Sequence, residues 1–289
     1  MASLELADGC SLEYQQLGEG PDLVLVHGLA TNRAFWYASL AQALKHAFRV
    51  TLYDLRGHGY SGMSPRGYSA VDQAQDLAAL FEAAGIESAD LVGHSYGGGI
   101  ALEFAVRHPQ KLRRLVLMDS KINRLQPEQH LSDSPHLSTM EVEIAERAGL
   151  DWEREPQVGL RYLEVTARLR AEQWAPQARD AFTPFGEGRS GMRGARQYLK
   201  LLDETEAPRE FLAKGASAER IAQIDVPTLL MYGERSRCLP SGRALAATLP
   251  DTQFRVVPEA GHFFPASHAA LIAGWTAEFL GSQLELPAG

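Results

Sequence analysis

Cysteine and long hydrophobic runs are both scarce in this sequence. Of its 289 residues only two are cysteine, Cys10 and Cys238, and they lie far apart, outside any metal-ligand spacing. This scarcity argues against a disulfide framework and predicts free thiols in a reducing compartment. No apolar run approaches the roughly 18 residues of a membrane span, and the first residues lack the basic and apolar regions of a secretory signal. We therefore expect a cytoplasmic protein that has no membrane partner.

Positive charge is the smaller share of the charged residues. The chain has 28 Lys and Arg against 36 Asp and Glu, which gives a formal net charge of −8. Nucleic-acid-binding surfaces need clustered Lys and Arg, so we expect no nucleic-acid partner. The histidines form no i, i+4 pair with a carboxylate, so we also expect no metal site, and we predict no cofactor.

Strand and helix patterns alternate over residues 2–119 and resume after Val226, with an opening hairpin around the Asp8-Gly9 turn. The predicted strands span residues 3–7, 11–16, 22–26, 48–53, 89–92, 115–118, 228–232 and 253–257. The predicted helices among them span residues 35–45, 70–84, 241–248 and 267–281. Apolar strands that alternate with helices are typical of a parallel sheet covered on both faces.

The pattern changes in the middle of the chain. Strand signals vanish there, and polar helical stretches appear over 140–148, 158–174 and 192–204. We therefore expect an α/β core formed by residues 1–119 and 223–289, and a helical cap, residues 120–222, inserted into that core.

The cap segment carries large aromatic side chains among its charged residues. Loops and insertions set specificity on many rigid scaffolds. Trp152, Trp174 and Phe185 are therefore candidate substrate-binding residues. The alternative is that the segment is an ordinary helical subdomain without a role in substrate binding.

The most informative motif is G-x-S-x-G over residues 93–97. An apolar strand precedes it, and a helical pattern with Ile100 and Phe104 on one face follows it. A serine on such a sharp strand-to-helix turn has a strained backbone, and the two glycines remove side chains that would collide with neighbouring segments. The hydroxyl of Ser95 is then exposed above the sheet, where the first N–H groups of the helix point. This arrangement is a nucleophile elbow.

Four further segments occur in the order found in one enzyme superfamily. They cover residues 24–29, 53–61, 226–230 and 258–263. With the elbow, they make the chain resemble the α/β-hydrolase superfamily, especially its cap-bearing serine esterases, over nearly all of its length outside the cap. The resemblance implies an α/β fold in which helices flank a mostly parallel sheet and a helical cap is inserted.

The resemblance also implies roles for individual residues. Ser95 is the candidate nucleophile, and His262, in a glycine-containing loop before the last helix, is the candidate base that takes its proton. The backbone N–H groups of Leu29 and Tyr96 are the candidate oxyanion hole. His27 and His94 are expected to have structural roles.

The triad acid is where the chain departs from the superfamily pattern. Members usually carry an Asp a few residues after the strand predicted at 228–232, where this chain has Ser236, which brings no negative charge. Asp119, at the end of the preceding predicted strand, is the favoured replacement, because some members place the acid there. Glu234, and a Ser–His dyad without any acid, are the alternatives.

These residues predict a serine hydrolase with a small-molecule acyl substrate. The expected reaction is cleavage of a carboxylic ester or thioester through an acyl-enzyme. Carbon–carbon bond hydrolysis, and acyl transfer or cyclisation, are alternative reactions of the same scaffold. A non-catalytic small-molecule binder is a second alternative, favoured by the serine at position 236. The sequence leaves the acyl group, the leaving group and the oligomeric state open.

Overall fold

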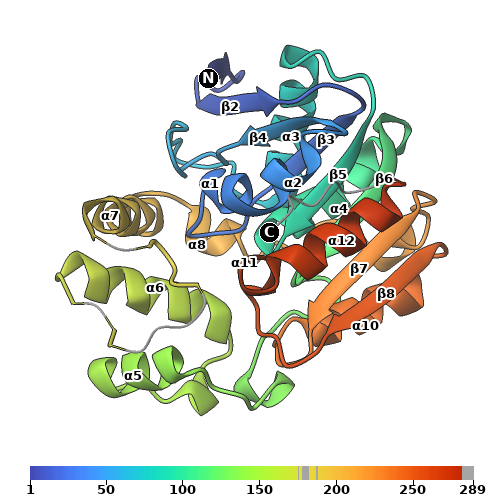
Figure 1. Ribbon diagram of the computed structural model, residues 1–289. Coiled ribbons are helices and arrows are strands. Elements are labelled where there is room, and N and C mark those ends of the chain that lie inside the picture. The colour runs from blue at the N-terminus through green and yellow to red at the C-terminus, as the bar shows by residue number, and fades with distance from the viewer. Residues whose placement is uncertain (175, 178–181, 187, 282–289) are drawn as a thin grey trace.

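An eight-stranded sheet forms the centre of the protein (Figure 1). The computed structural model describes residues 1–174, 176–177, 182–186 and 188–281. The strands lie in the order β1-β2-β4-β3-β5-β6-β7-β8, with β1–β2 and β2–β4 antiparallel and the other pairs of the sheet parallel. The strands are β1 Ala2–Glu5, β2 Ser11–Leu17, β3 Asp22–Val26, β4 Arg49–Tyr53, β5 Ala89–His94, β6 Leu112–Met118, β7 Thr228–Gly233 and β8 Thr252–Val257.

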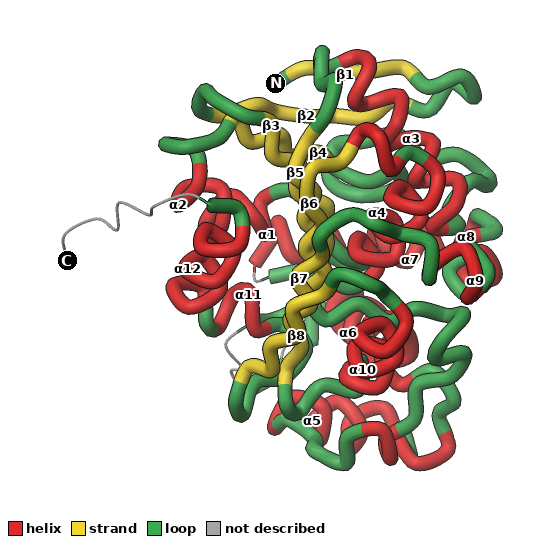
Figure 2. The backbone as a smooth tube through the Cα atoms, turned by 90° about the vertical axis from the view of Figure 1, so that its right-hand side faces the viewer, coloured by secondary structure: helices red, strands yellow, loops and turns green. Residues whose placement is uncertain are grey.

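Helices cover both faces of the sheet, as the edge-on view of Figure 2 shows. One face packs against α1 Ala34–Trp36, α2 Gln42–Leu44, α11 Phe264–Ser267 and α12 Ala269–Phe279. The other face packs against α3 Ala70–Ala83, α4 Tyr96–Arg107, α9 Ala218–Ile221 and α10 Leu239–Thr248. The protein therefore has two apolar cores, one on each side of the sheet.

Side chains of the inner strands alternate between these two cores. In β3, Val24 and Val26 pack with α3 and α4, whereas Leu23 and Leu25 pack with α12. All four side chains are fully buried. Because both faces are covered, the strand is a continuous apolar run instead of an alternating one. The predicted fold class, a mostly parallel sheet flanked by helices, is confirmed.

The chain leaves the sheet between β6 and β7 and forms no strand there within the described residues. Its helices in this segment are α5 Thr139–Ala148, α6 Val158–Ala171, α7 Gly188–Glu204 and α8 Ala207–Glu210, followed by α9. In Figure 1 the helices α5, α6 and α7 lie beside the sheet, where a cap is expected. The end of the segment packs differently, because Ala216 and Ile221, which precede the predicted boundary at residue 222, both belong to a sheet core.

Helix ends follow local sequence signals. The Ser138 hydroxyl accepts a hydrogen bond from the N–H of Glu141 at the start of α5, and Gly149 ends that helix with a φ of 65°. The helix predicted over 267–281 corresponds to α12, and the short helix α11 precedes it; the two are separated at His268, whose φ of −123° is not helical. The helix predicted over 35–45 contains a π-turn at Tyr37–Ala41 between α1 and α2.

Among the described helices, none has the length and apolar character that crossing a bilayer requires.

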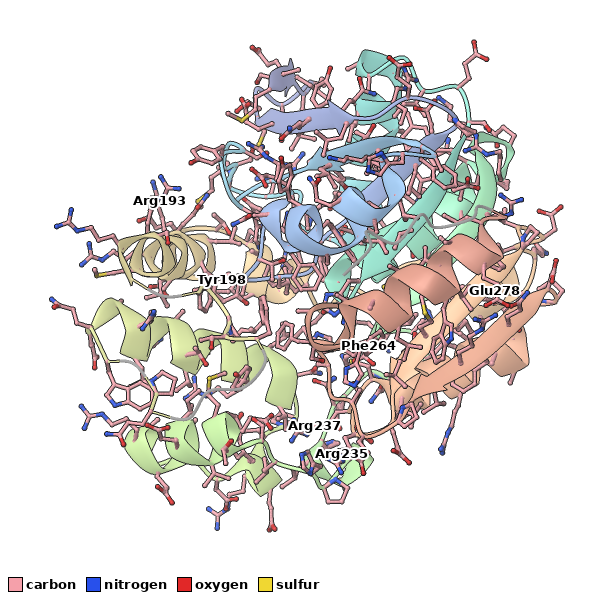
Figure 3. The ribbon with its side chains drawn as sticks, viewed as in Figure 1. Arg193, Tyr198, Arg235, Arg237, Phe264 and Glu278 are labelled. Carbon is pink, nitrogen blue, oxygen red and sulfur yellow. The ribbon has the colours of Figure 1, made fainter. Side chains whose placement is uncertain are left out.

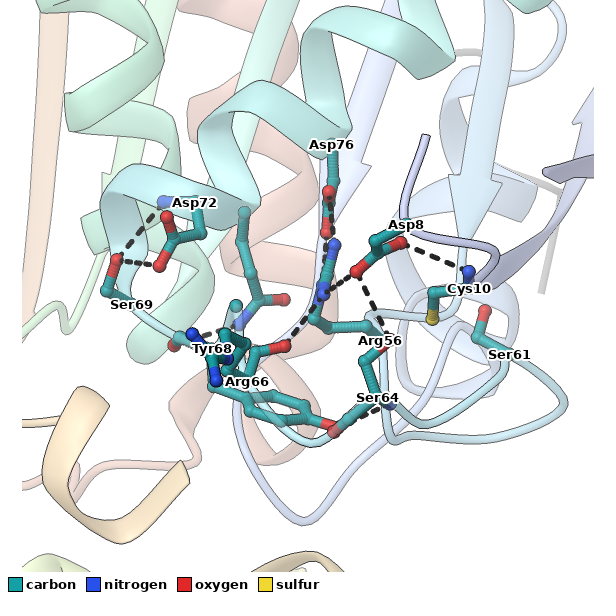
Figure 4. A network of polar contacts seen from close by, with 12 residues as sticks. Asp8, Cys10, Arg56, Ser61, Ser64, Arg66, Tyr68, Ser69, Asp72 and Asp76 are labelled. Carbon is teal, nitrogen blue, oxygen red and sulfur yellow. Dashed lines mark hydrogen bonds and ion pairs between the residues drawn. The ribbon is translucent and has the colours of Figure 1, made fainter. Parts of the chain in front are cut away.

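A buried arginine fixes the loop after β4 (Figure 4). Arg56 donates from Nε and Nη2 to the two carboxylate oxygens of Asp76, at 2.6 and 2.7 Å. Its Nη1 donates to Asp8 Oδ2 at 2.9 Å and to the Arg66 carbonyl at 3.0 Å. The network thus joins the β1–β2 turn, the loop after β4 and helix α3.

Candidate active site

Ser95 lies at the turn between β5 and α4, with a φ of 56° and a ψ of −124°. This conformation is costly for a residue with a side chain and is seen chiefly where surrounding packing enforces it. The flanking glycines make the turn possible. A Cβ on Gly93 would lie 2.5 Å from the Gly97 carbonyl oxygen, and a Cβ on Gly97 would lie 2.4 Å from the His27 carbonyl oxygen.

Three side chains from separate parts of the chain form one hydrogen-bonded line. The Ser95 Oγ lies 2.9 Å from His262 Nε2, and His262 Nδ1 lies 2.6 Å from Asp119 Oδ2. An ionised carboxylate can only accept, so Nδ1 carries the hydrogen and Nε2 of the neutral ring accepts from the serine hydroxyl. The line therefore has the direction needed to remove a proton from Ser95.

Asp119 is fully buried at the end of β6, next to the elbow strand β5. Its Oδ1 accepts from the N–H of Gly233 at 2.9 Å, and its Oδ2 accepts from the Ser236 hydroxyl as well as from His262. Ser236, which stands where the superfamily usually has its acid, thus donates to the carboxylate on the neighbouring strand. The other candidate acid, Glu234, instead accepts from the N–H of Glu259 at 2.7 Å.

The surroundings of His262 favour its protonated form. Burial lowers the pKa of His262, but the neighbouring sulfur of Cys238 and the carboxylate of Asp119 raise it more, so the net shift is upward. The Sγ of Cys238 lies 3.8 Å from Nδ1 and accepts from Nε2 of Gln129 at 3.2 Å. The imidazolium that would form on taking a proton from Ser95 is therefore stabilised where it forms.

His94 supports the loop that carries His262. It is fully buried, its ring stacks on Phe35 at 5.0 Å between centroids, and its Nε2 lies 3.0 Å from the carbonyl oxygen of His262, to which it donates. Burial lowers the pKa of His94 well below its usual range, so the ring is neutral. The contact spans 168 residues of sequence, and no local pattern could have revealed it.

A cavity of about 430 Å³ opens beside Ser95 and His262. Leu29 and Tyr96 line it near the serine, and the cap residues that line it include Tyr162 and Phe182. In Figure 3, Phe264 of α11 and the arginines at 235 and 237, which also line the cavity, lie where the sheet meets the cap.

The three aromatic residues predicted to bind substrate do not line this cavity. Trp152 is buried inside the cap, where its Nε1 donates to the Glu141 carbonyl at 3.0 Å. Trp174 packs against the same apolar cluster of the cap. Phe185 packs against Tyr198 of α7, with 5.5 Å between ring centroids. In the structure these three residues pack within the segment predicted to form the cap, and their role in substrate binding stays a prediction.

One group of described residues brings metal-ligating atoms within 4.8 Å of one another, namely Asp119, Cys238 and His262. A cation there would have to replace the hydrogen that His262 Nδ1 shares with Asp119. The geometry therefore suits proton transfer better than metal coordination.

Comparison with known proteins gives the family of this chain. A family model described as alpha/beta hydrolase fold matches residues 21–269. The chain belongs to this family. A pimeloyl-[acyl-carrier protein] methyl ester esterase of Chromobacterium violaceum is 34% identical over 282 residues, which are 94% of this chain and 99% of the relative. A 2-hydroxymuconate semialdehyde hydrolase of Pseudomonas sp. (strain CF600) is 28% identical over 95% of this chain and 92% of the relative.

A solved structure also resembles this α/β hydrolase. A thermophilic esterase from Thermogutta terrifontis matches it with a TM-score of 0.69 and 25% identity, over 97% of both chains. These relatives and neighbours are enzymes of the α/β-hydrolase family, esterases among them. The predicted family and the predicted hydrolase class are confirmed, and the protein is an esterase-like α/β hydrolase.

Proposed function

We propose that this α/β hydrolase is a serine hydrolase that cleaves a carboxylic ester or thioester of a small-molecule acyl compound through an acyl-enzyme. The observation that carries the proposal is the continuous hydrogen-bonded line from Ser95 through His262 to Asp119. The esterase relative that covers nearly the whole chain supports an ester as the bond cleaved.

In this mechanism the Ser95 hydroxyl attacks the acyl carbon while His262 Nε2 takes its proton. Asp119 keeps the hydrogen on Nδ1 and balances the positive charge of the imidazolium. His262 then gives the proton to the leaving alcohol or thiol, and the acyl group stays bound to Ser95. A water molecule next loses a proton to His262 and attacks the acyl-enzyme, which releases the acid and restores the serine hydroxyl.

The oxyanion of each tetrahedral intermediate needs hydrogen-bond donors close to Ser95. We assign this role to the backbone N–H groups of Leu29 and Tyr96. Both residues line the cavity beside Ser95, and Tyr96 is the first residue of α4, where backbone N–H groups have no partner within the helix. The strained backbone of Ser95 contributes to this arrangement, because it directs both the Ser95 hydroxyl and the first N–H groups of α4 toward the cavity.

Labelling and turnover of the Ser95→Ala variant test the proposal. A fluorophosphonate should label the wild-type protein on Ser95 and leave the variant unlabelled, and the variant should hydrolyse p-nitrophenyl esters about 10⁴-fold more slowly or worse. Circular dichroism and the melting temperature control for the fold. If the variant kept more than about a tenth of the wild-type kcat, Ser95 would not be the nucleophile.

Carbon–carbon bond hydrolysis is the second candidate, because a 2-hydroxymuconate semialdehyde hydrolase matches nearly the full chain. The same serine chemistry serves both reactions, so the two are separated by substrate and not by the triad. A panel of esters, thioesters and vinylogous diketones, followed by product analysis, decides between them. Turnover of the diketones in preference to every ester would replace ester cleavage by carbon–carbon cleavage.

A further inference from the structure

The catalytic cavity contains more positive than negative charge, although the whole chain has a formal charge of −8. Among the described residues that line it, three carry a carboxylate: Glu103, Glu141 and Glu259. Four are lysines or arginines, which carry a positive charge: Lys121, Lys214, Arg235 and Arg237. The charge of the cavity is therefore opposite in sign to that of the protein as a whole.

Each of these carboxylates already has a cationic partner. The pairs are Arg237–Glu141 at 2.6 Å, Arg107–Glu103 at 3.1 Å and Arg235–Glu259 at 3.7 Å. The pairing leaves two lysines, Lys121 and Lys214, with no carboxylate partner in the part of the chain that the structure describes. Of these two, Lys214 is exposed, whereas Lys121 is partly buried.

Lys121 is held in place by neutral oxygens. Its Nζ donates to Asn123 Oδ1 at 2.8 Å and to the Pro127 carbonyl at 3.3 Å. Asn123 is itself fixed, because its Nδ2 donates to the carbonyls of Phe211 and Ala213 at 2.7 and 3.1 Å. An ammonium group has three hydrogens to donate, so one remains for a bound molecule. The lysine is thus oriented before any ligand arrives.

Among the described residues, no acid is in direct contact with this ammonium group, although the charges of Asp133 and Glu128 favour it from a distance. Asp133 accepts from the backbone N–H of His130, and Glu128 pairs with the ring of His130. Burial lowers the pKa of Lys121 to about 8, which still leaves it mainly protonated at neutral pH. A partly buried cation that no counter-ion contacts is unfavourable, and an anionic group of a ligand in direct contact would reduce that penalty.

We propose that Lys121, oriented by Asn123, is an anion subsite of the catalytic cavity and binds a carboxylate that the substrate carries away from its scissile bond. Lys121 lies two residues after Asp119, on the loop that leaves β6 for the cap, and it lines the same cavity as Ser95. The inference rests on the proposed ester hydrolysis and narrows its substrate class to monoesters or monothioesters that also bear a free carboxylate.

Pairs of charged and neutral substrates of equal length test the subsite. One series places the carboxylate on the acyl part, as in monomethyl esters of dicarboxylic acids, and is compared with the corresponding ω-amides. A second series places it on the leaving alcohol, as in acetate esters of hydroxy acids, again against the amides. In at least one series and at one chain length, the wild type should prefer the charged member roughly 10- to 100-fold in kcat/KM, as expected for a hydrogen bond between charged groups.

The Lys121→Met variant should reduce this preference to nearly one. Lys200→Met is the matched control, because Lys200 is exposed on α7 and does not line the cavity. It should keep the wild-type preference. Equal kcat/KM for charged and neutral members in both series of the wild type would overturn the proposal, as would an unchanged preference in Lys121→Met.

Binding measurements separate a failure of the subsite from a failure of the proposed chemistry. Calorimetry on the Ser95→Ala protein compares the affinity of the charged and neutral members without turnover. Tighter binding of the charged member, lost in the Ser95→Ala, Lys121→Met double variant, supports the subsite even if the wild type cleaves a different bond. Fluorophosphonate labelling of the wild type reports on the serine chemistry alone.

Discussion

The sharpest test of the active-site geometry is the replacement of Asp119 by asparagine. The carboxylate accepts hydrogen bonds from the Gly233 N–H, the Ser236 hydroxyl and His262 Nδ1, and it is fully buried. An amide of the same size has one oxygen and one NH₂ group, so it cannot accept from all three donors. Asp119→Asn must therefore leave one of these contacts with two donors facing each other.

Either orientation of the amide is unfavourable for catalysis. If its oxygen faces Gly233, its NH₂ group faces His262, and the ring must move its hydrogen to Nε2, which can then no longer accept the proton of Ser95. If its oxygen faces His262, its NH₂ group opposes the N–H of Gly233. In both orientations the amide also lacks the negative charge that balances the imidazolium. We expect kcat to fall by roughly 10³–10⁴-fold, or about 4–5 kcal/mol in transition-state stabilisation.

The assay is kcat for p-nitrophenyl ester hydrolysis, with the melting temperature as a measure of folding. Glu234→Gln is the matched control, because Glu234 is exposed and contacts the N–H of Glu259 instead of His262. It should stay within about twofold to threefold of the wild type. Ser236→Ala removes one of the three donors to the carboxylate and should cost roughly 10-fold. A folded Asp119→Asn enzyme within 10-fold of the wild-type rate would refute the reasoning.

Three further predictions concern protonation, positioning and stability. The pKa of His262 is raised, and in the proposed mechanism its neutral ring is the base, so activity should be lost as the pH falls through a value above the usual 6.5. In a pH profile of kcat/KM, the Cys238→Ala variant should lose its activity at a lower pH than the wild type does. His94→Phe should lower kcat roughly 10-fold, because the His262 carbonyl loses its hydrogen-bond donor. His94→Gln can still donate and should recover part of the lost kcat, and equal rates of the two variants would contradict a positioning role. Arg56→Met leaves Asp76 buried without its partner and should lower the free energy of unfolding by about 3–5 kcal/mol in urea titrations, whereas an unchanged denaturation midpoint would contradict that.

The sheet and the elbow could be predicted because the packing that they require leaves short patterns in the sequence. Leu23–Val26 is apolar without alternation because both faces of β3 are covered, and Gly93 and Gly97 are required by carbonyl oxygens within 2.5 Å of where a Cβ would lie. The carbonyl oxygen that faces Gly97 belongs to His27, 70 residues earlier, so these constraints come from tertiary packing, but each of them restricts residues that lie close together in the sequence. They leave a pattern that can be read in the sequence without knowledge of the tertiary structure.

The cavity could not be predicted in the same way, because hydrophobicity does not distinguish its lining from the interior of the cap. Trp152 and Tyr162 both belong to the apolar cluster of the cap, yet of the two only Tyr162 also lines the cavity. Ser236 is a similar case. Its hydrogen bond to Asp119 joins residues 117 positions apart, and the sequence alone showed only that the usual acid was missing.

The position of Asp119 has a consequence for how this enzyme can diversify. Ser95 and Asp119 stand at the ends of adjacent strands, β5 and β6, and both precede the cap segment, whereas His262 follows it. The spacing of the proposed nucleophile and acid is thus set within one uninterrupted strand–helix–strand unit. Insertions, deletions or exchange of the cap leave that spacing unchanged. The segment between β6 and β7 can therefore change while the proposed nucleophile and acid are inherited as one block. The loop after β7 carries no acid, and it is tied to that block only through residues such as Ser236 and Cys238, which contact Asp119 and His262.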